Sequence, residues 1–356
     1  MKLPEGVHGD YGHYIWKKWM ALFIIAACLF GGVVVSLSVG SSGIGPAEIV
    51  RALFGRGLQS SRTIIWNIRM PRIATAITVG MALAMAGCIM QNLLRNPLAS
   101  ASTLGITQGA TFGAAVSIIY FQGGAQVAYA AANPVTFTNP YSVVLFAFIG
   151  GISTTILILL LARVIGVTPS VMILAGVAIS AMFTGATALI QYFSDDVRIA
   201  SVVYWTFGNL GRAGWSEILL ILGVSVAAFF YFMYNRWNYN AMESGTSTAK
   251  SLGVNVNLLI LAGMIIATLV SATAIAFVGT INFIGLIAPH IVRRFTGNDY
   301  RFLIPASALM GALVMLLSDI CSRILFPPAV LPIGALTSFL GAPLFLYMII
   351  KKGNIR

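Results

Sequence analysis

Charged residues are scarce in this 356-residue chain, and their scarcity excludes an ordinary water-soluble fold. Asp, Glu, Lys and Arg together make up 8% of the sequence, against about 25% in a typical soluble domain. Hydrophobic residues make up 58%, and the mean hydropathy is +0.92. A single soluble core stops growing near ~250–300 residues and has no room for so much apolar surface. The chain is therefore expected to use lipid as its solvent.

Cysteine and histidine are also rare, with three residues of each. Cys28, Cys88 and Cys321 each lie inside an apolar run, a spacing that fits neither a disulfide framework nor a zinc site. The histidines are dispersed along the chain. The sequence therefore predicts no metal bound by this chain.

Acidic residues are the rarer charged class, at nine against 21 Lys and Arg. Proton pumps and secondary transporters place ionisable groups near mid-span. Here Asp319 alone is expected inside a helix, and Arg323 follows four residues later on the same face. We interpret the two as a structural pair. An ion-gradient-driven secondary transporter remains the alternative to an externally powered one.

Catalytic and phosphate-binding motifs are missing too. The segment 245–251 lacks the glycine before its lysine and is one residue short of a phosphate-binding loop. Neither H-E-x-x-H nor G-x-S-x-G occurs. The chain is thus expected to have no catalytic residue and to hold no cofactor, and a membrane enzyme is an alternative without residues to name. Basic residues stand singly at the ends of apolar runs, which predicts no nucleic-acid binding.

Apolar runs of about 20 residues, enough to cross a hydrocarbon core of ~30 Å, predict an all-α polytopic membrane protein with ten helices. The eighth run is too short to cross at full thickness, so we expect a half-length helix shielded by its neighbours. The spans are expected near 17–39, 64–91, 102–121, 141–163, 170–193, 216–235, 256–278, 283–295, 302–326 and 333–350.

The distribution of Lys and Arg orients the chain. With the N-terminus inside, 13 of the 21 lie inside and 8 outside, which favours cytoplasmic termini and a cytoplasmic segment 1–16. The uncharged stretch 122–139 is expected to be an external loop on the membrane. Small residues spaced at 105, 109 and 113, and at 80, 84 and 87, predict faces where helices pack closely.

Polar and glycine-rich motifs interrupt the apolar spans in a specific order. They are Arg69-Met-Pro-Arg72, Gln91, Arg95-Asn-Pro-Leu98, Leu104-Gly105, Leu174-Ala-Gly-Val-Ala178, Gly208-Asn-Leu210, Ala249-x-x-Leu252-Gly253, Phe283-Ile-Gly-Leu-Ile-Ala-Pro-His290, Gly297-Asn-Asp-Tyr-Arg301 and Pro332-Ile-Gly334. In this order and across most of its length, the chain resembles the FecCD-type permeases of ABC importers for iron chelates, haem and cobalamin.

The resemblance implies a single transmembrane permease domain over residues 1–356, similar to the cobalamin-importer permease (type II ABC importers). It also implies a homodimer in the cytoplasmic membrane, with a pathway along the two-fold axis. Two ATP-binding subunits would dock inside, carrying ATP and Mg, and an extracytoplasmic binding protein would dock outside.

The resemblance also assigns site residues by their match to the family motifs. Coupling to the ATPase would use the loop 241–253, with Ala249, Leu252 and Gly253, together with Pro289 and Arg293. The binding protein would dock on Arg69, Arg72 and Arg323. Gates would be formed by Asn96, Leu98, Thr168, Pro169 and Ser170, and the pathway would be lined by Leu174, Gly176, Ala178 and Ser180.

Two departures from the family pattern bear on docking and on the solute. The last helix is preceded by Val330-Leu-Pro-Ile-Gly334 where relatives often have an acidic residue, and Tyr300 replaces a histidine in the turn Asp299-Tyr300-Arg301. The resemblance favours an iron chelate, either siderophore or haem, with cobalamin second. An importer of molybdate or tungstate is the alternative within the family.

Overall fold

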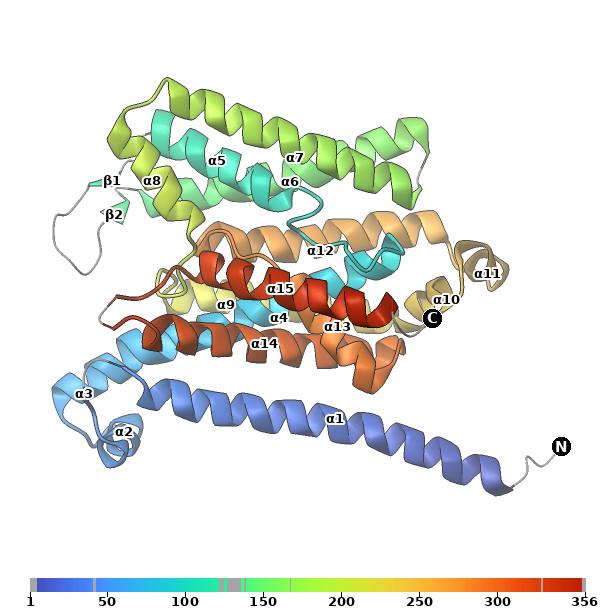
Figure 1. The fold of residues 1–356 in the computed structure, drawn as a ribbon, viewed down its shortest axis with the longest axis horizontal. Coiled ribbons are helices and arrows are strands. Elements are labelled where there is room, and N and C mark those ends of the chain that lie inside the picture. Colours follow the sequence, from blue (N-terminus) through green and yellow to red (C-terminus); the bar gives the residue numbers. More distant parts are fainter. Residues whose placement is uncertain are drawn as a thin grey trace.

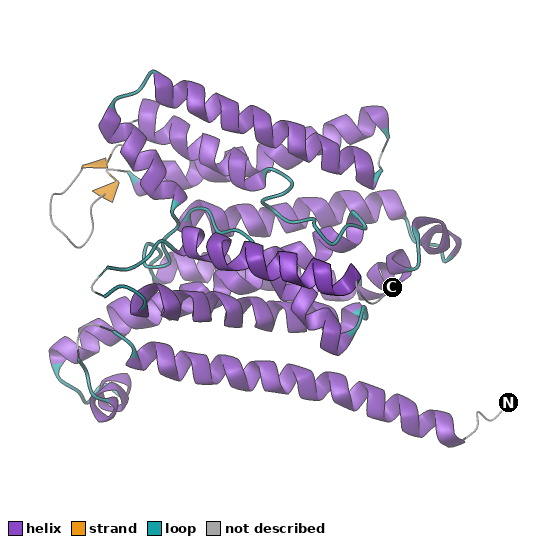
Figure 2. Ribbon diagram, viewed as in Figure 1, coloured by secondary structure: helices purple, strands orange, loops and turns teal. Residues whose placement is uncertain are grey.

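The computed structural model describes residues 5–40, 43–121, 125–126, 136–137, 139–166, 168–327 and 329–353. These residues form a bundle of long, roughly parallel and antiparallel helices (Figure 1), with short helices and loops at its two ends (Figure 2). Helix α1 begins and α15 ends at the end of the bundle that carries α10 and α11. Helices α2, α3 and α8 lie at the opposite end.

The helices follow the apolar runs closely. In chain order they are α1 (Glu5–Ser38), α2 (Pro46–Leu53), α3 (Gln59–Ile64), the π-helical segment η1 (Ile65–Arg69), α4 (Met70–Leu93), α5 (Ile106–Tyr120), α6 (Pro140–Ile165), α7 (Pro169–Tyr192), α8 (Asp196–Thr206), α9 (Trp215–Tyr234), α10 (Arg236–Glu243), α11 (Thr246–Ser251), α12 (Val256–Val278), α13 (Ile284–Thr296), α14 (Tyr300–Ile324) and α15 (Ile333–Gly353).

Seven of the helical stretches among the described residues are long and apolar enough to cross a membrane, and each matches a span expected from the sequence. They are Gly12–Ser38, Gln59–Leu93, Pro140–Ile165, Pro169–Tyr192, Trp215–Tyr234, Val256–Val278 and Tyr300–Ile324. Three expected spans are helices that do not meet this criterion: α5 has 15 residues, α13 has 13, and the apolar part of α15 ends at Tyr347. The count of ten crossings stays a prediction.

Side-chain caps explain where several helices begin. The Thr168 hydroxyl accepts a hydrogen bond from the Val171 amide, and Pro169 occupies the first turn of α7, where its missing N–H costs nothing. Asn139 caps α6 and Asn255 caps α12 in the same way. Each cap supplies an acceptor to an amide that the helix itself leaves without one.

Helix α4 is the centre of the bundle. It packs against α14, α12, α13 and α9. Within Gln59–Leu93, 83% of the most apolar 18-residue segment is buried. Helix α4 therefore lies against protein on nearly all sides, while α1 runs along one flank of the bundle against α14. A sequence of small and apolar residues all round suits a helix with no water-facing side.

Glycines allow the backbones at this centre to touch. A methyl group placed on Gly87 of α4 would collide with the Gly285 carbonyl of α13, and one on Gly113 of α5 would collide with the Phe146 carbonyl of α6. These contacts confirm the close packing that the small-residue spacing predicts, since only glycine permits such an approach.

Helices α5, α6 and α7 form a second group at one side of the bundle (Figure 1). Helix α12 joins the two groups, because it packs against both α4 and α6. Only 28% of the most apolar 18-residue segment of α7 is buried. Helix α7 therefore presents a broad apolar face to whatever surrounds the chain.

Several short elements were not expected from the sequence. They include α2, α3, α8 and two antiparallel strands, β1 (Ala125–Gln126) and β2 (Thr136–Phe137). Asp195 caps helix α8, since its carboxylate accepts from the Arg198 amide. The 11 residues of α8 are too few to register as a span. Most of the external loop expected at 122–139 lies outside the described residues.

Candidate functional site

An ionic cluster of Asp319 with Arg72 and Arg323, and with Arg69 nearby, lies at the end of the bundle opposite α10 and α11. Asp319 is fully buried in α14. One of its carboxylate oxygens lies 2.7 Å from Arg72 Nε of α4, and the other lies 3.0 Å from Arg323 Nη2, in an ion pair. The Asp319–Arg323 pair expected from i,i+4 spacing is therefore present, and Arg72 joins it from 247 residues away along the chain.

The arginines of this cluster also bind the last turn of α1. Arg323 Nη1 donates to the Ser36 and Val39 carbonyls, at 3.2 and 3.0 Å, and Arg69 donates to the Leu37 carbonyl. Arg69 is 5% exposed. The cluster joins the ends of α1, α4 and α14, so the arginines already have structural partners. Their proposed role in docking a binding protein stays a prediction.

The opposite end of the bundle carries the segment expected to couple to an ATPase. Helices α10 and α11 and the turn after them project from the bundle (Figure 1). Ala249 is buried, whereas Leu252 at the end of α11 is 68% exposed. Gly253 follows with a φ of 83°, a left-handed conformation that favours glycine. The segment thus offers one large apolar side chain on a tight, fixed turn.

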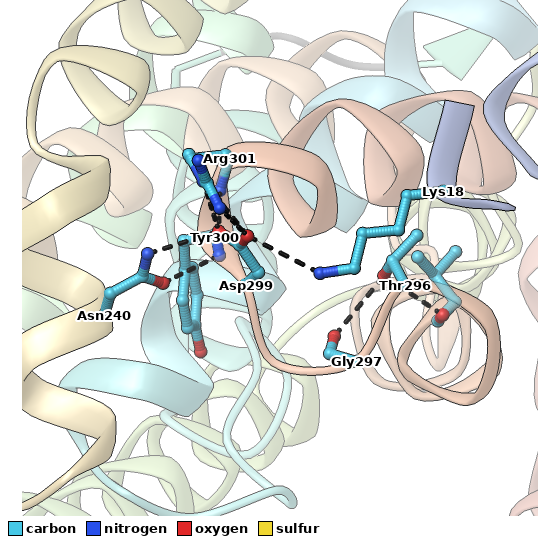
Figure 3. Close-up of polar contacts among 8 residues, drawn as sticks. Lys18, Asn240, Thr296, Gly297, Asp299, Tyr300 and Arg301 are labelled. Atoms are coloured by element: carbon cyan, nitrogen blue, oxygen red, sulfur yellow. Dashed lines mark hydrogen bonds and ion pairs between the residues drawn. The ribbon is translucent and has the colours of Figure 1, made fainter. Parts of the chain in front are cut away.

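A second ionic cluster anchors α10 to the bundle (Figure 3). Asp299, at the start of α14, accepts from Arg301 Nη2 at 2.7 Å and from Asn240 Nδ2 of α10 at 3.2 Å. Lys18 of α1 lies 3.5 Å from the same carboxylate, and its side chain is 2% exposed. Asn240 also accepts from the Tyr300 amide at 2.8 Å. One carboxylate therefore joins α1, α10 and α14.

The charge of Asp299 is stabilised by these neighbours. Burial acts to raise the pKa of the Asp299 carboxyl. Hydrogen bonds from the Arg301 side chain and amide and from Asn240 outweigh burial and hold the pKa at about 2. A carboxyl with a lowered pKa adds stability above its ordinary pKa of 3.8, and this stability is lost as the pH falls toward 2.

We expect Asp299→Asn to destabilise the protein by about 1.5–3 kcal/mol at pH 7, the contribution of a hydrogen bond to a charged group. The difference from wild type should shrink below pH 4 and become small near pH 2, where about half of the wild-type carboxyl is protonated. Thermal unfolding of both proteins in detergent, from pH 7 to pH 2, measures this difference in stability. An equal difference at pH 7 and pH 2 would contradict the assignment.

A chain of contacts continues from this cluster to the central helix. Tyr300 is buried, and its hydroxyl lies 3.5 Å from Arg293 Nη2 of α13. Arg293 Nη1 donates to Gln91 Oε1 of α4 at 2.7 Å, and Gln91 in turn donates to the Gly285 carbonyl at 3.2 Å. The half-buried Arg293, predicted to contact the ATPase, thus has its guanidinium bonded to α4 and α14 of its own chain. Pro289 is buried in the middle of α13.

The four residues of α7 expected to line the pathway divide between two faces. Gly176 packs against Leu104, and Ser180 lies beside Gly105, both where α5 begins. Leu174 and Ala178 are exposed on another face, with Leu174 at 70%. Only the second pair therefore faces open space in this chain. The pathway role of all four stays a prediction.

The expected gate residues lie at helix ends. In the turn after α4, Asn96 Oδ1 accepts from the Leu98 amide at 2.8 Å, and the Leu98 side chain is exposed. Thr168 and Ser170 are exposed at the start of α7, on either side of the half-buried Pro169. Both segments are polar turns with free surface, and their role as gates is likewise untested by this geometry.

Sequence reasoning missed the partners that tie these elements together. Lys18 and Asn240 carry no motif, and their contacts with Asp299 span 281 and 59 residues. Asp299 itself could be found from the sequence, because an aspartate directly before an apolar run is a signal for the start of a helix. Among the described residues, no cluster of three or more His, Cys, Asp or Glu forms a metal site.

The comparisons with known proteins agree over nearly the whole chain. A sequence model of the FecCD transport family matches residues 27–351. The "Putative ABC transporter permease protein MJ0087" of Methanocaldococcus jannaschii is 50% identical over 352 residues, covering 99% of each chain. The "Hemin transport system permease protein HmuU" of Yersinia pestis is 34% identical, covering 91% of this chain and 95% of the relative.

Two further matches extend this agreement to another named solute and to a solved structure. The "Fe(3+)-citrate import system permease protein YfmE" of Bacillus subtilis is 35% identical, covering 94% of this chain and 95% of the relative. A structure described as "An inward-facing conformation of a putative metal-chelate type ABC transporter" matches with a TM-score of 0.78 at 28% identity, covering 93% of this chain and 98% of that one.

Proposed function

The chain belongs to the FecCD transport family and is a multi-pass permease subunit of an ABC importer, and we propose that it moves an iron chelate into the cell. The observation that carries the proposal is the match of residues 27–351 to this family, since two of the named relatives are described as permeases for hemin and for iron(III) citrate. Cobalamin, the second solute considered, receives no support from these relatives.

The arrangement of the two ends supports this proposal. The exposed Leu252 on the α10–α11 segment is suited to a pocket on an ATPase subunit, and the arginine cluster lies at the other end, where a binding protein would deliver the solute. Cytoplasmic termini and a homodimer around the exposed face of α7 belong to the same proposal. An apolar face of that size is stable either in lipid or against a second copy.

We infer an alternating-access mechanism in which the partner ATPase supplies the energy and the permease changes between two conformations. ATP binding would close the ATPase subunits and push on the segment 241–253. The Asp299 cluster would transmit this displacement, because Asn240 of α10 is bonded to the start of α14. The push shifts the permease only if the ATPase contacts its two conformations differently.

Uptake into proteoliposomes tests the proposal. Vesicles containing this chain, its ATPase and its binding protein are expected to accumulate a radiolabelled iron chelate only when ATP is present. Ferric citrate, a ferric hydroxamate and hemin would be supplied in parallel, with molybdate as an oxyanion comparison. Accumulation that ignores ATP and follows an imposed proton or sodium gradient would instead support a secondary transporter, and ATP-driven uptake of molybdate alone would reject the iron chelate.

A further inference from the structure

A cavity of about 220 Å³ lies between the start of α6, the start of α9 and the end of α12. It contains one group of each charge, Arg212 and Glu217, and we call it the two-charge pocket. The rest of its lining is apolar or aromatic and includes Tyr141, Val144 and Phe277. A guanidinium and a carboxylate therefore share a pocket whose other walls suit hydrocarbon.

The loop between α8 and α9 places Arg212 in this pocket. The Asn209 amide donates to the Val278 carbonyl at 2.7 Å, and the Gly211 amide donates to Asn209 Oδ1 at 2.8 Å. These bonds hold the loop against the last turn of α12. Burial lowers the pKa of the Arg212 guanidinium to about 10, so the group stays positively charged at pH 7.

Glu217 supplies the negative charge from the first turn of α9. One of its carboxylate oxygens accepts from the Gly214 amide at 2.9 Å, and the other accepts from the Tyr141 hydroxyl of α6 at 3.3 Å. Both donors are neutral, and no described residue forms an ion pair with Glu217. Its charge is therefore available to a cation in the pocket.

The pocket lies at the level where helices leave the membrane. Helices α6, α9 and α12 are each long and apolar enough to cross it, and the pocket is built mainly from their ends. Tryptophan and tyrosine are common at this level. Tyr141 is 68% exposed, and the exposed Trp215 donates from Nε1 to the Trp66 carbonyl at 3.2 Å. Lipid headgroups are therefore the molecules that surround this pocket.

From its charges and its position, we propose that the two-charge pocket binds a zwitterionic phospholipid, with the phosphate at Arg212 and the ammonium at Glu217. A guanidinium matches a phosphate with parallel N–H donors, and an ammonium donates to a carboxylate. The partly exposed Val144 and Phe277 offer apolar surface to the acyl chains. An anionic phospholipid brings a negative charge near Glu217 without a cation to offset it. The inference does not depend on which solute the permease moves.

Native mass spectrometry of the full chain tests the inference. The chain would be released from micelles that contain equal amounts of phosphatidylethanolamine and phosphatidylglycerol with the same acyl chains. We expect the first bound lipid to be phosphatidylethanolamine. Free phosphoethanolamine at equal concentration should not displace it, because this molecule has the same charges but no acyl chains to cover the apolar walls.

Two variants separate the roles of the two charges. Glu217→Gln keeps the size of the side chain and an acceptor for the Gly214 amide. It should lower the preference for phosphatidylethanolamine over phosphatidylglycerol about tenfold, the effect of one charge-assisted hydrogen bond. Arg212→Gln should weaken both lipids to a similar extent, because both carry the phosphate.

Glu48→Gln is the matched control. Glu48 accepts from the Leu58 amide at 2.6 Å, as Glu217 accepts from an amide, and it does not line the pocket. It should keep the wild-type preference, and monodisperse elution would show that each variant is folded. Equal retention of the two lipids by the wild-type chain would overturn the inference without any variant. An unchanged preference in folded Glu217→Gln, unchanged lipid binding in folded Arg212→Gln, or displacement by phosphoethanolamine would overturn it too.

Discussion

Replacing Asp319 by asparagine is expected to lower the free energy of unfolding by about 3–5 kcal/mol, the cost of leaving buried charges without their partner. Asp319 is fully buried and supplies the negative charge to both Arg72 and Arg323. An asparagine keeps the shape of the side chain but leaves two nearby positive charges facing each other. Thermal unfolding of the purified chain measures the effect.

Asp195→Asn is the matched control, because Asp195 pairs with Arg198 on the surface, with both side chains about half exposed. An exposed pair contributes about 0–1 kcal/mol, and asparagine still caps α8. Combining Arg323→Met with Asp319→Leu should recover part of the stability, since it removes an unpaired charge. Equal unfolding temperatures for Asp319→Asn and Asp195→Asn would show that the cluster is not a buried ion network.

Replacing Leu252 by aspartate is expected to abolish capture of the ATPase subunit and ATP-driven uptake. The change removes an exposed apolar side chain and puts a charge at the predicted centre of the contact. If Leu252 is a central anchor of this contact, its loss costs the about 2–4 kcal/mol of an interface hot spot, which is roughly a 30- to 1,000-fold loss of affinity. Adding Gly253→Asp should deepen the defect, but the left-handed φ of Gly253 strains any side chain there. The single variant therefore gives the clearer measurement.

Leu58→Asp is a control of the same residue type and exposure, since Leu58 is 69% exposed in the segment between α2 and α3. Pull-down of the ATPase subunit by each variant, after reconstitution, gives the readout. The control should retain the subunit. Full capture and normal uptake by Leu252→Asp would remove the segment 241–253 from the coupling surface.

Composition and the length of apolar runs predict the helices well, because a membrane crossing requires a long apolar run and little else. The expected span at 256–278 and the helix Val256–Val278 have the same bounds, as an asparagine cap fixes its start and Gly279 its end. Helix α13 was expected to be short, and it has 13 residues shielded against α4 and α14. Helix α8 was missed because its 11 residues are too few to register as a span.

The contacts between helices were much harder to predict than the helices themselves. Spacing of four residues places Asp319 beside Arg323, because both lie on one helix. Nothing local places Arg72 against the same carboxylate, or Lys18 against Asp299, since these pairs depend on how distant helices pack.

The position of α4 at the centre also sets an order for biosynthesis. Helix α4 leaves the ribosome before α12, α13 and α14, the helices that later enclose it. Asp319 follows Arg72 by 247 residues, so at about 5–20 residues per second the arginine precedes its counter-ion by roughly 12–50 s. During this interval the apolar sequence of α4 tolerates lipid, and Arg72 lies in the first turn of α4, near the end of the span. The newly made chain therefore completes its core last, when α14 inserts.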